Sequence, residues 1–173
     1  MSSCRCVLVP TMVKQLETAS GNPVTVRQVA AGYFHCLALA VDGSVYCWGA
    51  NETSRSKACS GRLGIGTAMC APKPTLLRFD GLVESGHVIA QISAGHSHSA
   101  AVTDDGNVWI WGILRNPLVR DDETFIPTGY IAFPQRLHGL QVHEHVRSTV
   151  QRCTAFSNWF CGLLLGSFCV TNI

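Results

Sequence analysis

VAAGYFHCLALAVDGSVYCWG, residues 29–49, and ISAGHSHSAAVTDDGNVWIWG, residues 92–112, are two copies of one pattern, 63 residues apart. They align without a gap, and nine of the twenty-one positions are identical. A fixed long period of this kind indicates a repeat architecture. The identical residues are Ala31, Gly32, His35, Ala38, Asp42, Gly43, Val45, Trp48 and Gly49, matched by Ala94, Gly95, His98, Ala101, Asp105, Gly106, Val108, Trp111 and Gly112.

Each copy has the pattern of a β-hairpin. Leu37, Leu39 and Val41 alternate with small residues, and this two-residue period is typical of a strand with two unlike faces. Asp42-Gly43 separates that run from the apolar residues 45–48. Asp-Gly between two apolar runs favours a tight turn, because both central residues can take positive φ.

The segment that links the two copies predicts further strands. It carries Pro72 and Pro74, which suit a loop or an edge strand, and it ends in the apolar pair Val88-Ile89. Each unit is therefore expected to contain about four short strands. One such sheet cannot bury both of its faces, but stacked neighbours can, which is the logic of a β-propeller. The period is longer than those of WD40 and kelch blades, and each hairpin ends in Trp-Gly instead of Trp-Asp.

The motifs AAGYFHCLAL…DGSVYCWGAN…GRLGIG…P and SAGHSHSAAVTDDGNVWIWG resemble the repeat of the regulator of chromosome condensation family. The resemblance covers residues 11–146 and implies an all-β fold, a partial propeller of the seven-bladed type. About two blades of four antiparallel strands are expected, with repeat units at about 29–91 and 92–146. Residues 147–173 form a divergent apolar segment, in which the apolar run 159–170 is too short to span a bilayer. No membrane partner is expected.

The family resemblance also implies a partner. Its founding member is the exchange factor for the small GTPase Ran and binds chromatin, and other members serve as docking modules in ubiquitin ligases, kinases and trafficking regulators. The leading hypothesis is a protein-binding module, a fragment of a Ran-type exchange factor that speeds nucleotide release by stabilising the nucleotide-free GTPase. The alternatives are a generic docking propeller and an inactive truncated product. A nuclear location is expected before a cytoplasmic one.

Two features are candidates for partner contact. His96 stands where an irregular early unit of the Ran exchange factor has an aspartate in the motif S-A-G-D-S-H, and the family associates that aspartate with the exchange surface. The acidic run Asp121, Asp122 and Glu123 replaces the QLG-like segment in the second unit. An acidic patch on a loop can attract a basic partner surface, although such a run is also typical of a solvated loop.

The repeated positions are interpreted as structural. His35 and His98 recur without a nucleophile beside them, so we expect hydrogen-bonding side chains inside each blade instead of catalytic bases. Replacing Gly32 or Gly95 with valine is expected to destabilise the unit, because a β-branched residue tolerates a strained backbone poorly. The full set of structural positions is Gly32, His35, Gly43, Trp48, Gly49, Gly95, His98, Gly106, Trp111 and Gly112.

The sequence contains no G-x-S-x-G motif, no H-E-x-x-H motif and no repeated carboxylate pair, which argues against hydrolytic or metal-dependent enzyme chemistry. The formal charge of +2 is too balanced to favour nucleic acid, and nine cysteines without paired zinc spacing favour a reduced intracellular setting. Gly61-x-x-Gly64-x-Gly66 lacks the Lys-Ser/Thr of a phosphate loop and predicts a turn between blades. We expect no metal, no cofactor and no catalytic residue, and at most nucleotide-exchange activity.

Overall fold

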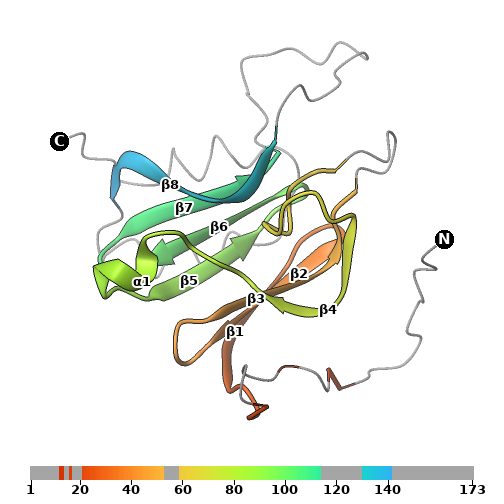
Figure 1. The fold of residues 1–173 in the computed structure, drawn as a ribbon, viewed down its shortest axis with the longest axis horizontal. Coiled ribbons are helices and arrows are strands. Elements are labelled where there is room, and N and C mark those ends of the chain that lie inside the picture. Colours follow the sequence, from red (N-terminus) through yellow and green to blue (C-terminus); the bar gives the residue numbers. More distant parts are fainter. Residues whose placement is uncertain (1–11, 14–15, 17–20, 53–58, 114–129, 142–173) are drawn as a thin grey trace.

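The chain folds into two four-stranded antiparallel sheets packed face to face (Figure 1). This computed structural model describes residues 12–13, 16, 21–52, 59–113 and 130–141. The first sheet has the order β1-β2-β3-β4 and the second β5-β6-β7-β8, so each sheet is a simple meander. The predicted all-β class is confirmed, and the two sheets are two blades of a partial β-propeller. We call them the first and the second blade.

The strands of the two blades occupy equivalent positions in the repeat. The first blade contains β1 (Val26–Ala31), β2 (His35–Ala40), β3 (Val45–Ala50) and β4 (Cys70–Leu76). The second contains β5 (Ile89–Ala94), β6 (His98–Thr103), β7 (Asn107–Gly112) and β8 (Ile131–Gln141). The short helix α1 (Leu82–Ser85) lies in the connection between the blades.

The turn at the tip of each hairpin is longer than predicted. The Gly43 N–H donates to the Ala40 carbonyl (3.1 Å), and the Ala40 N–H donates to the Ser44 carbonyl (2.8 Å). Residues 41–43 therefore form a three-residue loop. Gly43, its last residue, has a φ of 86°, which directs the chain into the next strand. The Gly106 N–H makes the same bond to the Thr103 carbonyl (3.0 Å). The expected tight two-residue turn is wrong, because Asp-Gly also suits the last two positions of this longer loop.

The prolines lie where a strand can tolerate them. Pro72 and Pro74 belong to β4, which pairs only with β3 and is therefore an edge strand of the first blade. A proline removes a backbone donor, and at an edge no neighbouring strand requires that donor. The register between β3 and β4 shifts between Cys47 and Gly49, so the edge strand bends there.

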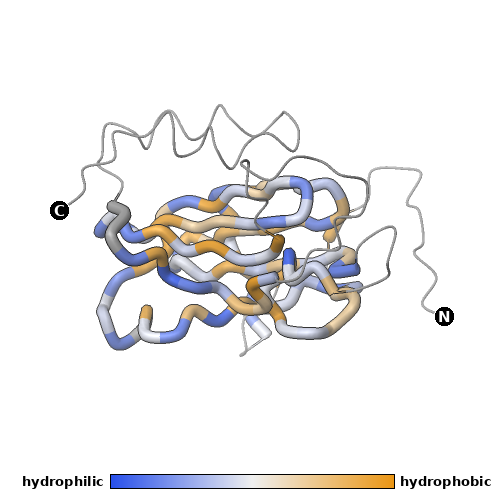
Figure 2. Tube along the Cα trace, turned by 90° about the horizontal axis from the view of Figure 1, so that it is seen from above, coloured by the Kyte–Doolittle hydropathy of each residue, from blue (hydrophilic) through white to orange (hydrophobic). Residues whose placement is uncertain are grey.

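The main core lies between the blades. Leu37 and Leu39, which the alternating pattern assigned to one face of a strand, are fully buried there. Figure 2 shows the hydrophobic residues of the two layers, in orange, gathered mainly in the interior. Full burial of one such side chain contributes about 1.5–3 kcal/mol. The core also contains Val45, Cys47, Leu63, Ile89, Ile92, Ala101, Trp109 and Trp111.

The two strand cysteines differ in their burial. Cys47 is fully buried, as expected for a small core residue, and burial raises the pKa of its thiol to about 12. Cys36 is only half-buried. It lies on the face of the first blade that points away from the second blade.

Candidate protein-interaction site

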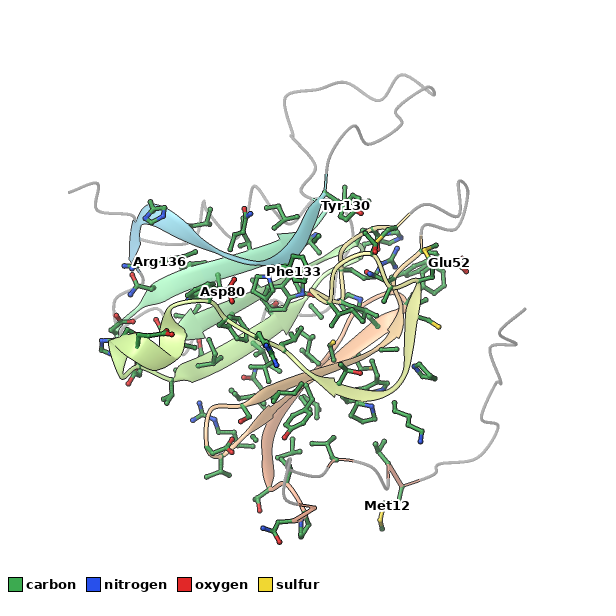
Figure 3. The ribbon with its side chains drawn as sticks, viewed as in Figure 1. Met12, Glu52, Asp80, Tyr130, Phe133 and Arg136 are labelled. Carbon is green, nitrogen blue, oxygen red and sulfur yellow. The ribbon has the colours of Figure 1, made fainter. Side chains whose placement is uncertain are left out.

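The β1–β2 loop, the β5–β6 loop and the segment after β3 meet at one end of the two sheets, which we call the loop end. The Ala50 N–H donates to the Phe34 carbonyl, and the Ile113 N–H donates to the Ser97 carbonyl, each at 2.8 Å. Figure 3 shows Glu52 at this end of the sheets and Arg136 at the opposite end. The Tyr33 N–H donates to the Gly95 carbonyl (3.3 Å), so the β1–β2 loop of the first blade lies beside the β5–β6 loop of the second.

An exposed aromatic cluster, formed by Tyr33, Phe34 and His96, lies on the loop end. The rings of Tyr33 and His96 are stacked, with centroids 4.2 Å apart, and the Phe34 ring meets Tyr33 edge-on at 4.4 Å. Tyr33 is 63% exposed and Phe34 is 42% exposed. Large aromatic side chains that are already held in place lose little conformational freedom on binding, so they are effective contacts for a protein partner.

Arg62 supports the aromatic cluster from beneath. Its side chain is 1% exposed, and its guanidinium carbon lies 5.5 Å from the centre of the Phe34 ring. Its three nitrogens donate to the Ser60 hydroxyl (2.7 Å), the His96 carbonyl (3.3 Å) and the Glu52 carbonyl (3.1 Å). Burial lowers the pKa of the Arg62 guanidinium below its ordinary range, and these acceptors compensate the buried charge. Arg62 thus ties the first blade to the β5–β6 loop.

His35 adds a second polar connection between the blades. Ser99 Oγ donates to the Arg62 carbonyl (2.9 Å), so it accepts the hydrogen bond from His35 Nε2 (2.8 Å). Burial, reinforced by the positive charge of Arg62, lowers the pKa of His35 to about 3, and the ring is therefore neutral near pH 7. The expected hydrogen bond inside one blade is wrong for His35, because its partner lies on β6 of the second blade.

Gly32 and Gly95 are required by close contacts with the histidine rings. A Cβ on Gly32 would lie 2.2 Å from His35 Cε1 and 2.6 Å from the Gly95 carbonyl oxygen. A Cβ on Gly95 would lie 2.4 Å from His98 Nε2. Neither glycine has a positive φ. The reason predicted from the sequence, a strained backbone, is therefore wrong, and the physical reason is lack of space.

The other repeated positions lie at strand ends and in the core. Trp111 is fully buried between the blades beside Gly64. Trp48 is half-buried and packs against both the core between the blades and a smaller cluster of Ala38, Ala40 and Tyr46. The glycines at the hairpin tips and at the ends of β3 and β7 have positive φ values: Gly43 86°, Gly106 90°, Gly49 112° and Gly112 98°.

The structure places one of the predicted contact residues in the site. His96 lies in the aromatic cluster, whereas Asp121, Asp122 and Glu123 lie outside the described residues. Sequence reasoning missed Tyr33 and Phe34, which occupy the two variable positions of the A-G-x-x-H motif. It also interpreted Gly61-Arg62-Leu63-Gly64 only as a turn, although an arginine stands there in place of the family's glutamine.

A possible group of metal ligands lies at the opposite end of the sheets. His87, Asp104 and Asp105 place one potential ligand atom each within 4.8 Å of one another. These side chains already bond to each other: His87 Nδ1 lies 3.1 Å from Asp104 Oδ1, and Nε2 lies 3.4 Å from Asp105 Oδ2. Asp105 also accepts hydrogen bonds from Thr103 and Asn107. We interpret the group as a hydrogen-bonded cap on the β6–β7 turn.

The described part of the chain contains no helix long and apolar enough to cross a membrane. Two stacked meanders joined by hydrogen bonds from blade to blade define a propeller-type repeat protein. The sequence pattern of the regulator of chromosome condensation (RCC1) repeat matches residues 26–54 and 89–116, and a second pattern of the same repeat matches residues 42–102. The chain belongs to this repeat family.

Curated relatives with quite different roles share this similarity. The chain is 34% identical over 90 residues to the ultraviolet-B receptor UVR8 of Arabidopsis thaliana, which covers 51% of the chain and 18% of UVR8. It is 37% identical over 94 residues to the human regulator of chromosome condensation, covering 54% and 20%. It is 36% identical over 108 residues to the probable human E3 ubiquitin-protein ligase HERC3, covering 62% and 9%. The chain thus spans a fifth or less of the length of these relatives.

Proposed function

We propose that the chain is a protein-binding propeller module whose loop end contacts a small GTPase of Ran type. The observation that carries this proposal is the aromatic cluster. Tyr33 and Phe34 are exposed, yet the stack on His96 and the buried Arg62 hold them in place. Anchors of this kind, on loops of a rigid scaffold, are typical of the centre of a protein interface.

The family resemblance supports the choice of partner. His96 occupies the position that the family associates with the exchange surface, and this residue lies in the centre of the loop end together with Tyr33. Exchange in such a system requires no covalent step. In a complete propeller, tighter binding to the nucleotide-free GTPase than to its GDP form would accelerate nucleotide release, whereas these two blades are expected to retain a preference in binding without the acceleration. A nuclear, chromatin-linked setting is part of the same proposal.

Binding to an immobilised Ran-type GTPase, in nucleotide-free and GDP-bound form, tests the proposal. We expect tighter binding to the nucleotide-free form, and loss of about tenfold or more in affinity for Tyr33→Ala, because truncation of a hot-spot anchor typically costs about 2 kcal/mol or more. Val41→Ala is the matched control, because Val41 is also 63% exposed but lies at a hairpin tip at the opposite end. Equal losses for both variants, or no binding to either form, would contradict the proposal.

A docking module within a larger ubiquitin ligase is the second candidate. It is supported by the similarity to HERC3, which covers a larger share of the chain, 62%, than the similarity to the regulator of chromosome condensation, 54%. The same cluster would serve this role without any preference between nucleotide states. Binding of the GTPase with equal affinity in both nucleotide states would favour this second candidate. So would a chain that does not bind the GTPase but binds a ligase substrate and loses that binding in Tyr33→Ala.

A further inference from the structure

A cavity of about 670 Å³ lies between the second blade and the connection that carries α1, at the end of the sheets opposite the loop end. We call it the connection groove. One wall is the face of the β7–β8 ladder, from which Trp109 and Arg136 project side by side because they are paired directly across the two strands. The other wall is the connection, with Asp80 and Leu82. Figure 3 shows Asp80 and Arg136 toward this end of the sheets.

A hydrogen-bonded chain of side chains fixes one end of the connection groove. Arg136 Nη2 donates to Asn107 Oδ1 (2.6 Å), and the Asn107 amide donates in turn to the Asp105 carboxylate. Asp105 Oδ2 also lies 3.4 Å from Nε2 of His87, which belongs to the connection. Side chains that are already fixed in this way lose little conformational freedom when a ligand binds, so this end of the groove is preorganised.

The charge of the lining favours a cationic group. Two carboxylates, Asp80 and Asp105, and one guanidinium, that of Arg136, line the groove, which gives a formal charge of −1 with the histidines neutral. Asp105 is engaged by its neighbours, whereas the Asp80 side chain is exposed and makes no hydrogen bond or ion pair with any other described residue. Asp80 is therefore the carboxylate that a cation can reach without displacing a bond of the protein.

The β7–β8 wall supplies hydrogen-bond donors. Trp109 is 6% exposed, and its indole N–H has no acceptor in the part of the chain that the structure describes. Buried indole N–H groups usually have a partner, so a ligand that brings an oxygen to this wall gains a bond that the described residues leave unmade. Arg136 uses one guanidinium nitrogen for Asn107, and its remaining N–H groups can donate to the same ligand.

We propose that the connection groove binds a short extended peptide that carries a lysine or arginine side chain. The cationic side chain lies against Asp80, and backbone carbonyl oxygens of the peptide accept hydrogen bonds from Trp109 and Arg136. A peptide is the ligand class that combines a cation with several carbonyl acceptors along one chain. Leu82 and Pro134 line the same groove and offer apolar contacts to its other side chains. Among the described strands β8 pairs only with β7, so a peptide can enter along this edge.

An array of random heptapeptides, probed with the fluorescently labelled full chain, tests the proposal. We expect the bound peptides to be enriched in lysine and arginine. Fluorescence polarisation with the best of them should show about tenfold weaker binding to Asp80→Asn, because a hydrogen bond to a charged group contributes enough for such a factor. Glu84→Gln is the matched control, since it removes the same charge from α1, but Glu84 does not line the groove. Trp109→Phe keeps a ring and removes the N–H, and should weaken binding about fivefold.

Three results would overturn the proposal: no bound peptide or enrichment in acidic ones, equal effects of Asp80→Asn and Glu84→Gln, or loss of peptide binding in Tyr33→Ala. The second result would indicate general attraction to negative charge, and the third would place the peptide at the loop end. Because Tyr33→Ala is expected to bind the peptide normally, the proposal stands or falls independently of GTPase binding. Circular dichroism establishes that each variant is folded. Asp80 is exposed, so Asp80→Asn is expected to fold even where Trp109→Phe does not.

Discussion

Replacement of Gly32 by valine should destabilise the joint between the blades. The new Cβ would lie 2.2 Å from His35 Cε1 and 2.6 Å from the backbone oxygen of Gly95. The ring cannot move away without losing its 2.8 Å bond to Ser99, and the Gly95 oxygen belongs to the other blade. Loss of that hydrogen bond costs about 1 kcal/mol, and overpacking costs about 1–3 kcal/mol more. We therefore expect a loss of about 2–4 kcal/mol in the free energy of unfolding.

Urea unfolding followed by tryptophan fluorescence measures this loss, because Trp111 is fully buried in the folded chain. Ala31→Val is the matched control. It adds the same branched side chain one residue earlier, at an exposed strand position, and should change stability by less than about 0.5 kcal/mol.

The double variant tests the stated cause. If the His35 ring is a main obstacle, Gly32→Ala should cost about 1 kcal/mol less in a His35→Ala background than alone. The remaining cost reflects the Gly95 oxygen, which His35→Ala does not remove. Equal costs of Gly32→Ala in both backgrounds would refute the steric explanation, and equal effects of Gly32→Val and Ala31→Val would refute the special role of Gly32.

Three further predictions concern the polar groups of the joint and the loop end. The pKa of His35 is about 3 in the folded chain and about 6.5 when unfolded, so the unfolded state binds more protons between these values. The stability is therefore fully present above about pH 6.5 and declines as the pH falls toward 3; pH-dependent urea unfolding should show a flatter decline for His35→Gln, but not for the exposed control His138→Gln. Arg62→Ala should cost about 2–4 kcal/mol in the same assay, because it leaves three acceptors without their donor, and Arg62→Gln should cost less because its amide retains two donors. The chain alone, in excess, should not accelerate release of fluorescent GDP from Ran, since by resemblance the exchange surface needs loops of several blades and His96 cannot supply a negative charge; acceleration would show that two blades suffice.

The repeat predicted the strands because burial imposes the same pattern on both copies. The alternation of Leu37 and Leu39 and the period of 63 residues determine which faces are apolar, and packing of those faces leaves few other arrangements. The turn length escaped prediction, because Asp-Gly is compatible with two loops that differ by one residue. Only the pairing of Leu39 with Val45 decides between them.

The candidate site could be predicted only in part, because a repeat identifies the positions that have the same structural role in every copy. Tyr33 and Phe34 occupy positions where the second copy has His96 and Ser97, so the comparison of copies marks them only as variable. Their exposure and stacking depend on loops that are distant in the sequence. The role of Arg62 could not be predicted either, because it depends on the His96 carbonyl, which lies 34 residues further along the chain.

The histidine of the motif shows why a blade is not a complete unit. His35 is buried with its Nε2–H directed at Ser99, and this acceptor belongs to the next blade. Without that acceptor the buried N–H would lose its hydrogen bond, at a cost of about 1–3 kcal/mol, so the neighbouring blade contributes to the stability of the first. A blade is therefore stabilised across the joint as well as by its own strand pairs, and the histidine of the repeat marks a contact between blades and not within one.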